Sequence, residues 1–229
     1  MIIKGFQKLT LLDYPGNLAC TIFTGGCNFR CPFCHNASIV LGEGSEDYTE
    51  EFIINFLKNR QGKLDGVAIT GGEPLLQNDI VGFINKVKNL GFKVKLDTNG
   101  SFPEKLTEII SLNIVDYVAM DIKNSPNKYA ETVGRLGYDY SRVEESIKIL
   151  MSSNVDYEFR TTVIKELHER EDIEAIGKNI CGAKNWFLQN FVDSGDLICK
   201  DMHGHSADTL KQYLEIARKY VPSAEIRGV

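Results

Sequence analysis

The sequence predicts an α/β protein whose parallel strands form a partial (β/α)6 barrel, similar to an incomplete TIM barrel. Short apolar segments alternate with amphipathic ones along the chain, which is the pattern of strands joined by helical crossovers. Polar residues follow several of the apolar segments, as they do on the active face of a barrel. The length of 229 residues, 43% of them hydrophobic, suits one domain of this size, so we expect residues 1–229 to form a single domain.

Six segments have the character of buried strands. Each is a short apolar run without clean alternation of polar and apolar residues, as expected of parallel strands covered on both faces. The predicted strands are 18–24, 66–70, 93–97, 117–121, 157–164 and 186–191.

Six further segments have the periodicity of helices. The first begins with Thr49 as a candidate cap, and Phe52, Ile53 and Phe56 follow on one face. The second ends at Gly91, a residue suited to a helix C-terminus. The predicted helices are 49–60, 76–90, 103–112, 140–153, 169–180 and 207–220.

The positions of the polar residues favour a barrel over an open, doubly wound sheet. Residues 71–74 follow the second strand, residues 97–100 end the third, and Asp121 and Lys123 end the fourth. A barrel collects side chains from the ends of many strands on one face. A doubly wound sheet would concentrate its ligands at one switch point.

Composition argues against several classes of protein. The net charge of −5 and the pI near 5.5 are unsuited to binding nucleic acid, which requires concentrated Lys and Arg. The longest apolar runs are of strand length and are interrupted by charges, so no membrane span is expected. The N-terminus has no long apolar stretch of the kind found in signal peptides. We therefore expect a cytoplasmic protein that contacts neither nucleic acid nor membrane.

Three of the six cysteines, Cys27, Cys31 and Cys34, lie within eight residues directly after the first predicted strand. Clustered cysteines in a reducing compartment indicate metal binding or catalysis rather than disulfides. Three thiolates can hold an iron–sulfur cluster, and a four-iron cluster held by three cysteines keeps one iron open to a substrate.

Two other chemistries compete for this loop. Structural zinc takes four ligands, whereas no second cysteine pair is present, and His35 is awkwardly placed beside Cys34. A redox dithiol formed by Cys31 and Cys34 would follow a strand, but it leaves Cys27 and residues 71–74 unexplained. The remaining cysteines, Cys20, Cys181 and Cys199, are expected to be small core residues.

Two motifs together resemble the radical S-adenosylmethionine (radical SAM) superfamily. The C-x3-C-x2-C loop with its aromatic residue Phe33 resembles the cluster-binding signature of that superfamily. Gly71-Gly72-Glu73-Pro74 is similar to its methionine-binding motif. Both motifs follow predicted strands in the expected order.

Shorter similarities narrow the family. The segments Leu-Asp-Tyr-Pro-Gly at 12–16 and Cys-His-Asn at 34–36 resemble the activating enzymes of glycyl radical enzymes. The run from Ile22 to Asn36 is similar to activators of anaerobic ribonucleotide reductase, while 97–100 and 120–123 resemble the pyruvate formate-lyase activating enzyme. The resemblance covers most of the chain and weakens after about residue 164.

The resemblance implies a reaction and its partners. A reduced [4Fe-4S] cluster would split S-adenosylmethionine into methionine and a 5′-deoxyadenosyl radical. That radical would remove hydrogen from a backbone glycine of a glycyl radical enzyme, the protein substrate. The electron would come from a flavodoxin or a ferredoxin-type donor.

Residues near the first two motifs are expected to contact S-adenosylmethionine. The resemblance implies that Gly71 and Gly72 present backbone carbonyls to its ammonium group, while Glu73 orients their loop. Phe33 and His35 are expected to border the adenine.

Further along the chain, the resemblance implies that Asp97, Thr98 and Asp121 hold Na⁺ or K⁺ beside the methionine carboxylate. Asp is also common at turns, so the two aspartates could instead close loops. Lys123 could neutralise the same carboxylate without a metal, and Arg160 could pair either with the ligand or with a strand-end aspartate.

Three other polar residues are weaker candidates. Gln189 ends the sixth predicted strand, where it would contact ribose or adenine or simply pack. His203 and His205 lie in a polar loop, where they are either metal ligands or solvated residues.

Two other functions fit the sequence less well than an activating enzyme. A small-molecule radical SAM enzyme, such as 7-carboxy-7-deazaguanine synthase, would share the compact barrel. A non-catalytic electron-transfer or metal-binding module would have a fully ligated metal and no use for residues 71–74.

Overall fold

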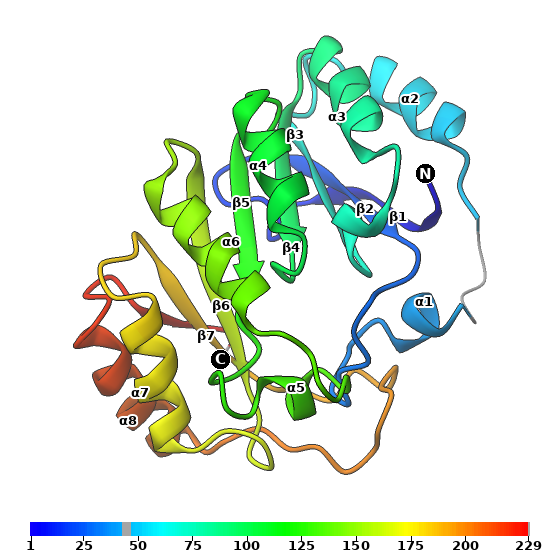
Figure 1. Ribbon diagram of the computed structural model, residues 1–229. Coiled ribbons are helices and arrows are strands. Elements are labelled where there is room, and N and C mark those ends of the chain that lie inside the picture. Colours follow the sequence, from blue (N-terminus) through cyan, green and yellow to red (C-terminus); the bar gives the residue numbers. More distant parts are fainter. Residues whose placement is uncertain (43–46, 229) are drawn as a thin grey trace.

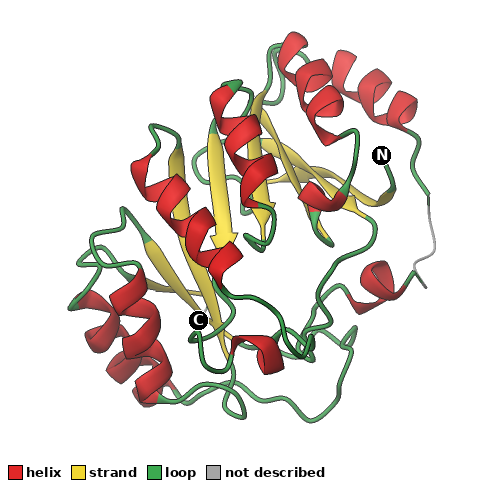
Figure 2. Cartoon of the chain, in the orientation of Figure 1, coloured by secondary structure: helices red, strands yellow, loops and turns green. Residues whose placement is uncertain are grey.

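The computed structural model describes residues 1–42 and 47–228, and its strands form one curved sheet (Figures 1 and 2). In the described part of the chain the strands pair in the order of the sequence, from β1 to β8. Their bounds are β1 Ile3–Thr10, β2 Ala19–Thr24, β3 Gly66–Gly71, β4 Lys93–Thr98, β5 Tyr117–Asp121, β6 Asp156–Val163, β7 Trp186–Asn190 and β8 Glu225–Arg227.

The helices are α1 Ala37–Leu41, α2 Glu50–Lys58, the 3₁₀ helix η1 Pro74–Leu76, α3 Ile80–Asn89, α4 Pro103–Ser111, α5 Tyr129–Thr132, α6 Ser141–Ser152, α7 Arg170–Asn179 and α8 Ala207–Arg218. The longer helices connect the strands and lie along the outer side of the sheet, whereas the short helices α1 and α5 lie beyond the carboxyl ends of the strands (Figures 1 and 2). None of these helices combines the length and apolarity needed to cross a bilayer.

The predicted α/β fold with a partial barrel is confirmed. All strands from β2 to β8 are parallel, and each pairs with its neighbour in the chain. This order excludes a doubly wound sheet, in which the strand order reverses at a switch point. It places the carboxyl ends of seven parallel strands along one edge, where a barrel carries its active site.

The predicted strands and helices are present, with ends shifted by a few residues. The largest shift is in the predicted helix 76–90, which begins only at Ile80, as α3. Leu76 instead ends η1, whose first turn is capped by the Glu73 carboxylate, which accepts from the Leu75 amide.

Two edge strands, β1 and β8, and two short helices, α1 and α5, were not predicted from the sequence. Strand β1 runs antiparallel to β2. Its middle residues are only partly buried or exposed, so it lacks the apolar run that marks the central strands. The other missed elements are five residues long or less, too short to show a periodicity.

Candidate active site

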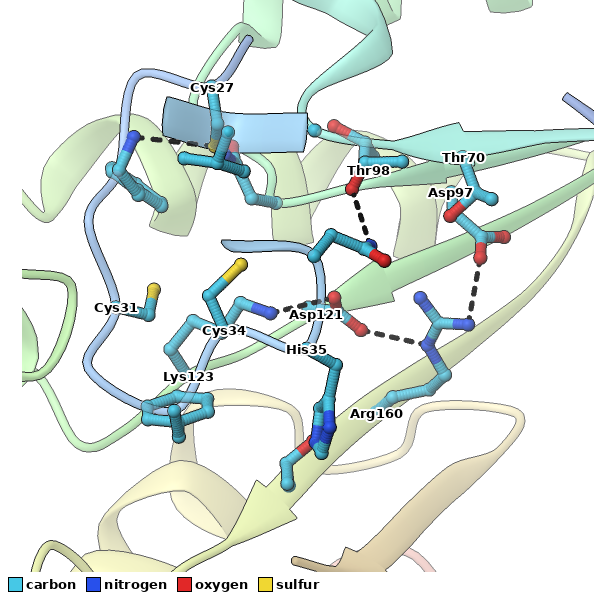
Figure 3. A pocket seen from close by; sticks show the side chains of 18 of the residues that line it. Cys27, Cys31, Cys34, His35, Thr70, Asp97, Thr98, Asp121, Lys123 and Arg160 are labelled. Atoms are coloured by element: carbon cyan, nitrogen blue, oxygen red, sulfur yellow. Dashed lines mark hydrogen bonds and ion pairs between the residues drawn. The ribbon is translucent and has the colours of Figure 1, made fainter. Parts of the chain in front are cut away.

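A cavity of about 240 Å³ lies at the carboxyl ends of the parallel strands (Figure 3). It is lined by the cysteine loop, residues 25–36, and by the ends of β3 to β7. The structure brings together most of the residues that the sequence singled out, and Glu73, His203 and His205 are the exceptions. The lining includes Cys27, Cys31, Phe33, Cys34, His35, Gly71, Gly72, Asp97, Thr98, Asp121, Lys123, Arg160 and Gln189.

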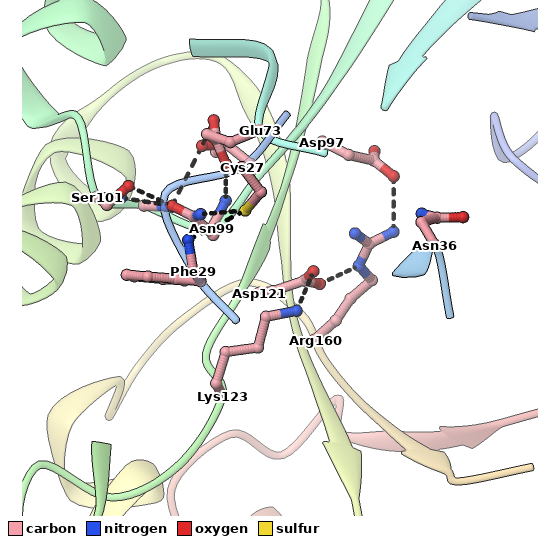
Figure 4. Close-up of polar contacts among 12 residues, drawn as sticks. Cys27, Phe29, Asn36, Glu73, Asp97, Asn99, Ser101, Asp121, Lys123 and Arg160 are labelled. Atoms are coloured by element: carbon pink, nitrogen blue, oxygen red, sulfur yellow. Dashed lines mark hydrogen bonds and ion pairs between the residues drawn. The ribbon is translucent and has the colours of Figure 1, made fainter. Parts of the chain in front are cut away.

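The three clustered thiols share this cavity, and two donors approach the first of them. The Phe29 amide lies 3.4 Å from Cys27 Sγ, and Asn99 Nδ2 lies 3.7 Å from it (Figure 4). Burial raises the pKa of Cys27 to about 11 and that of Cys31 to about 12. These two thiols therefore stay protonated at neutral pH unless metal binding displaces the proton.

This donor set fits an iron–sulfur cluster better than a single metal ion. In the described chain no three His, Cys, Asp or Glu side chains are arranged to hold a single metal ion. Three thiols around one cavity match three corners of a four-iron cluster. The amide donors at Cys27 are of the kind that tune cluster potentials.

The two glycines at the end of β3, Gly71 and Gly72, allow this turn to pack closely against the cysteine loop. A Cβ on Gly72 would lie 1.9 Å from the Gly26 carbonyl oxygen, and Gly71 has φ +107°. The Gly71 carbonyl already accepts a hydrogen bond from Asn36 Nδ2 at 2.9 Å. The glycines therefore fix the distance between two loops, in addition to any contact with a ligand.

Glu73 is fully buried and does not line the cavity. Its carboxylate accepts hydrogen bonds from the Leu75 amide, the Thr98 hydroxyl and the Asn99 amide, at 3.0, 2.8 and 2.7 Å. Burial raises its pKa to about 7, although these donors oppose the shift. Glu73 thus ties the turn after β3 to the end of β4.

A chain of ion pairs crosses the inner side of the cavity (Figures 3 and 4). Arg160 donates to Asp121 Oδ1 at 2.8 Å and to Asp97 Oδ2 at 3.0 Å. Lys123 donates to the other oxygen of Asp121, at 2.8 Å. Although burial opposes ionisation, Arg160 and Lys123 hold the pKa of Asp121 well below its usual range.

Arg160 thus lies between the two carboxylates that were expected to hold Na⁺ or K⁺. Thr98, the third expected ligand, directs its hydroxyl to Glu73 and accepts from the Gly100 amide at 3.2 Å. Arg160 therefore pairs with the strand-end aspartates, which was one of its two expected roles.

Phe33 and His35 occupy the other side of the cavity. Phe33 is buried, and the His35 ring packs on Phe191 with centroids 5.3 Å apart. Burial and Lys123 lower the pKa of His35, so its ring is neutral at physiological pH.

His203 and His205 lie outside the cavity lining. His203 pairs with Glu166 at 2.8 Å, and the His205 ring contacts Tyr213 edge to face. Neither belongs to a group of metal ligands in the described chain.

Several cavity residues were missed or misjudged from the sequence. Asn36 and Asn99 belong to the Cys-His-Asn and Asp-Thr-Asn-Gly segments, and their place in those motifs was the available signal. Thr70 and Thr162 carry no such signal.

Among the scattered cysteines, Cys20 is buried as expected. The prediction that Cys181 and Cys199 are core residues was wrong, since both are exposed.

The comparison with known proteins agrees with the geometry. Residues 21–179 match the model of the radical SAM superfamily. The chain is 34% identical to a protein of Methanocaldococcus jannaschii provisionally named a glycyl-radical enzyme activating enzyme, over 100% of this chain and 96% of that protein. It is 28% identical to the pyruvate formate-lyase 1-activating enzyme of Escherichia coli, covering 74% of this chain and 70% of that enzyme.

Among solved structures, a radical SAM methyltransferase from Sphaerobacter thermophilus has the same fold, with a TM-score of 0.74 and 12% identity over 96% of this chain and 68% of that one. The cysteine loop, the turn after β3 and the barrel thus occur together in a chain with a full-length activating-enzyme relative. The chain belongs to the radical SAM superfamily and, within it, to the family of glycyl-radical enzyme activating enzymes.

Proposed function

We propose that this enzyme activates a glycyl radical enzyme of the anaerobic ribonucleotide reductase or pyruvate formate-lyase type. The observation that carries the proposal is the single cavity that joins three thiols, the glycine turn after β3 and a set of buried charges. The full-length similarity to a provisionally named activating enzyme supports this choice of reaction.

In this proposal Cys27, Cys31 and Cys34 hold a [4Fe-4S] cluster. When bound, the cluster supplies the electron that splits S-adenosylmethionine into methionine and the 5′-deoxyadenosyl radical. Buried side chains of the lining, such as Phe29 and Phe33, shield one part of the cavity from water.

The remaining lining residues bind and orient S-adenosylmethionine. Arg160 and Lys123 attract the methionine carboxylate, because both side chains line the cavity and carry positive charge. Phe33 and His35 border the adenine, with Gln189 nearby, and the turn at Gly71 and Gly72 borders the methionine ammonium group. The glycine of the protein substrate would have to reach the same cavity.

The partners follow from the chemistry. A flavodoxin or ferredoxin-type protein would supply single electrons, and a glycyl radical enzyme would accept the radical. We further propose that residues 1–229 act as one domain in the cytoplasm, without a nucleic acid or membrane partner.

The test combines the anaerobically reconstituted protein, S-adenosylmethionine, dithionite and a glycyl radical enzyme encoded beside its gene. We expect 5′-deoxyadenosine and a glycyl radical doublet in the electron paramagnetic resonance spectrum of the partner. Formation of 5′-deoxyadenosine without a protein radical, together with turnover of a small molecule, would favour the deazaguanine synthase alternative. Absence of S-adenosylmethionine cleavage would leave only a non-catalytic module.

A further inference from the structure

Lys95 is a buried lysine inside the barrel to which the sequence pattern assigned no role. It lies on β4, two residues before Asp97, so both side chains are on the inward face of the strand. Only 2% of Lys95 is exposed, and its ammonium group contacts Asp97 Oδ1. Lys95 does not line the cavity, so it lies behind Asp97 as seen from the ligand position.

Lys95 sets the net charge of the ion-pair chain at the cavity. Three cations, Lys95, Lys123 and Arg160, face two carboxylates, Asp97 and Asp121, which gives a net charge of +1. Without Lys95 the set would be neutral.

Another buried acid, Glu158, whose charge also acts on Arg160, does not change this balance. Glu158 is bound by Arg227 through two hydrogen bonds of 2.8 and 3.0 Å, so the pair is neutral. Glu73 accepts from three neutral donors outside the five groups, so it makes no ion pair with a cation of the chain.

The same contacts give every carboxylate oxygen of the two aspartates a cationic partner within the protein. Asp97 is shared by Lys95 and Arg160, and Asp121 is shared by Arg160 and Lys123. Arg160 uses Nε and Nη1 in these pairs, and its Nη2 makes no protein hydrogen bond in the described chain. A ligand carboxylate would therefore meet a free guanidinium nitrogen in a site of net charge +1.

We propose that Lys95 replaces the monovalent cation expected between Asp97, Thr98 and Asp121, so that the methionine carboxylate binds without Na⁺ or K⁺. This inference rests on the proposed function, because it assumes that S-adenosylmethionine occupies this cavity. Lys95 is a positioning residue: it acts through Asp97 and does not touch the ligand.

The test measures the affinity for S-adenosylmethionine, not turnover. Binding to the cluster-loaded protein is followed anaerobically by calorimetry, at fixed ionic strength, in Na⁺, K⁺ or tetramethylammonium chloride. For the unaltered protein we expect the same Kd in all three salts. For Lys95→Met we expect binding weakened by roughly tenfold to a hundredfold in tetramethylammonium, with recovery in Na⁺ or K⁺.

Two variants separate charge from structure. The control is Lys93→Met, which alters the same residue type on the same strand. Lys93 is exposed, and its ammonium donates to Asn17 at 3.2 Å, away from the cavity. The Kd of this variant for S-adenosylmethionine should therefore equal that of the unaltered protein in every salt. The double variant Lys95→Met with Asp97→Asn restores the net charge of +1 and should bind S-adenosylmethionine independently of the salt.

The outcomes are distinct. A Kd of the unaltered protein that depends strongly on Na⁺ or K⁺ would overturn the inference, whether or not any variant folds. Undiminished binding by Lys95→Met in tetramethylammonium would overturn it too, and would show that Lys123 and Arg160 suffice. No binding of S-adenosylmethionine by the unaltered protein in any salt would instead refute the proposed function.

Discussion

At the scale of single residues, one close contact in the site joins two loop backbones, where the Glu73 amide donates to the Gly26 carbonyl at 2.9 Å. Gly72 leaves no room for a side chain, because a Cβ would lie 1.9 Å from the Gly26 carbonyl oxygen. Gly26 directly precedes Cys27, so a displacement here is transmitted to the proposed cluster. Gly72 is therefore required by the packing of two loops as well as by any ligand.

This contact leads to a first prediction. Gly72→Ala should lower the free energy of unfolding by about 2–4 kcal/mol and reduce the iron bound after reconstitution, because two backbones must separate. Gly82→Ala is the matched control: its Cβ would meet nothing within 4 Å, and it lies within α3, so it should stabilise by about 0.5–1 kcal/mol. Chemical denaturation and iron analysis measure both. Full stability and iron content in Gly72→Ala would show that the two loops can separate at no cost.

The cysteines give a second prediction. Replacing Cys27, Cys31 or Cys34 with Ala should abolish the broad visible absorption and most bound iron, because a three-cysteine site has no spare ligand. Cys181→Ala and Cys199→Ala change exposed thiols and should keep the full iron content. Iron retained by a protein lacking one of the first three would show that another group holds the metal.

Glu73 gives a third prediction, which concerns pH. Its pKa is raised from 4.5 to about 7 by burial, so between these values the folded state keeps a proton that the unfolded state releases. Protonation of Glu73 therefore makes its full contribution to the free energy of unfolding, up to about 3 kcal/mol, below about pH 4.5. This contribution is lost as the pH rises to about 7.

Glu73→Gln should remove this part of the pH dependence, because the amide does not titrate. The measurement is the difference in unfolding free energy between variant and unaltered protein, both metal-free, at pH 5 and pH 8. Glu131→Gln, at an exposed position, is the control and should show no such difference. An identical pH dependence in Glu73→Gln and the unaltered protein would contradict the raised pKa of Glu73.

At the scale of elements, a segment far along the chain holds the first helix. Asp196, between β7 and α8, accepts hydrogen bonds from the Ser38 amide at 3.1 Å and from its hydroxyl at 2.8 Å. The Cys199 amide donates to the Pro32 carbonyl at 2.9 Å within the cysteine loop. Residues 191–206, orange in Figure 1, thus fasten the cysteine loop and α1 from outside.

This fastening gives a fourth prediction. Asp196→Ala should speed the removal of iron by a chelator several-fold and lower stability by about 1–2 kcal/mol, since the Ser38 donors lose their acceptor. Asp193→Ala, in the same segment, removes a carboxylate that accepts from the nearby Gly195 amide rather than from α1, and it should leave the rate unchanged. Equal chelation rates for the two variants would mean that the contact between Asp196 and Ser38 does not help to retain the iron.

The elements also show what the sequence could predict. The central strands were found because each is an apolar run buried on both faces, and Cys27, Gly71 and Asp121 were found because they follow such runs. Strand β1 was missed because an edge strand needs no continuous apolar pattern. Lys95 was missed because a lysine inside a strand resembles a surface residue until its place inside the barrel is known.

At the scale of the whole molecule, the sheet remains open. Strand β1 pairs only with β2, and β8 pairs only with β7, so in the described chain the two ends of the sheet do not join. The active face is therefore built by seven parallel strands that share an edge, rather than by a closed ring.

The strand order also allows the sheet to form in the order of synthesis. Each strand pairs with its chain neighbour, so the sheet can grow from the N-terminus as the chain leaves the ribosome. The cysteine loop emerges early, whereas Asp196 and Cys199 emerge more than 150 residues later. Until then the cysteine loop and α1 lack the hydrogen bonds that fasten them from the last quarter of the chain, so the loop that carries the thiols is less restrained in the nascent chain than in the folded protein.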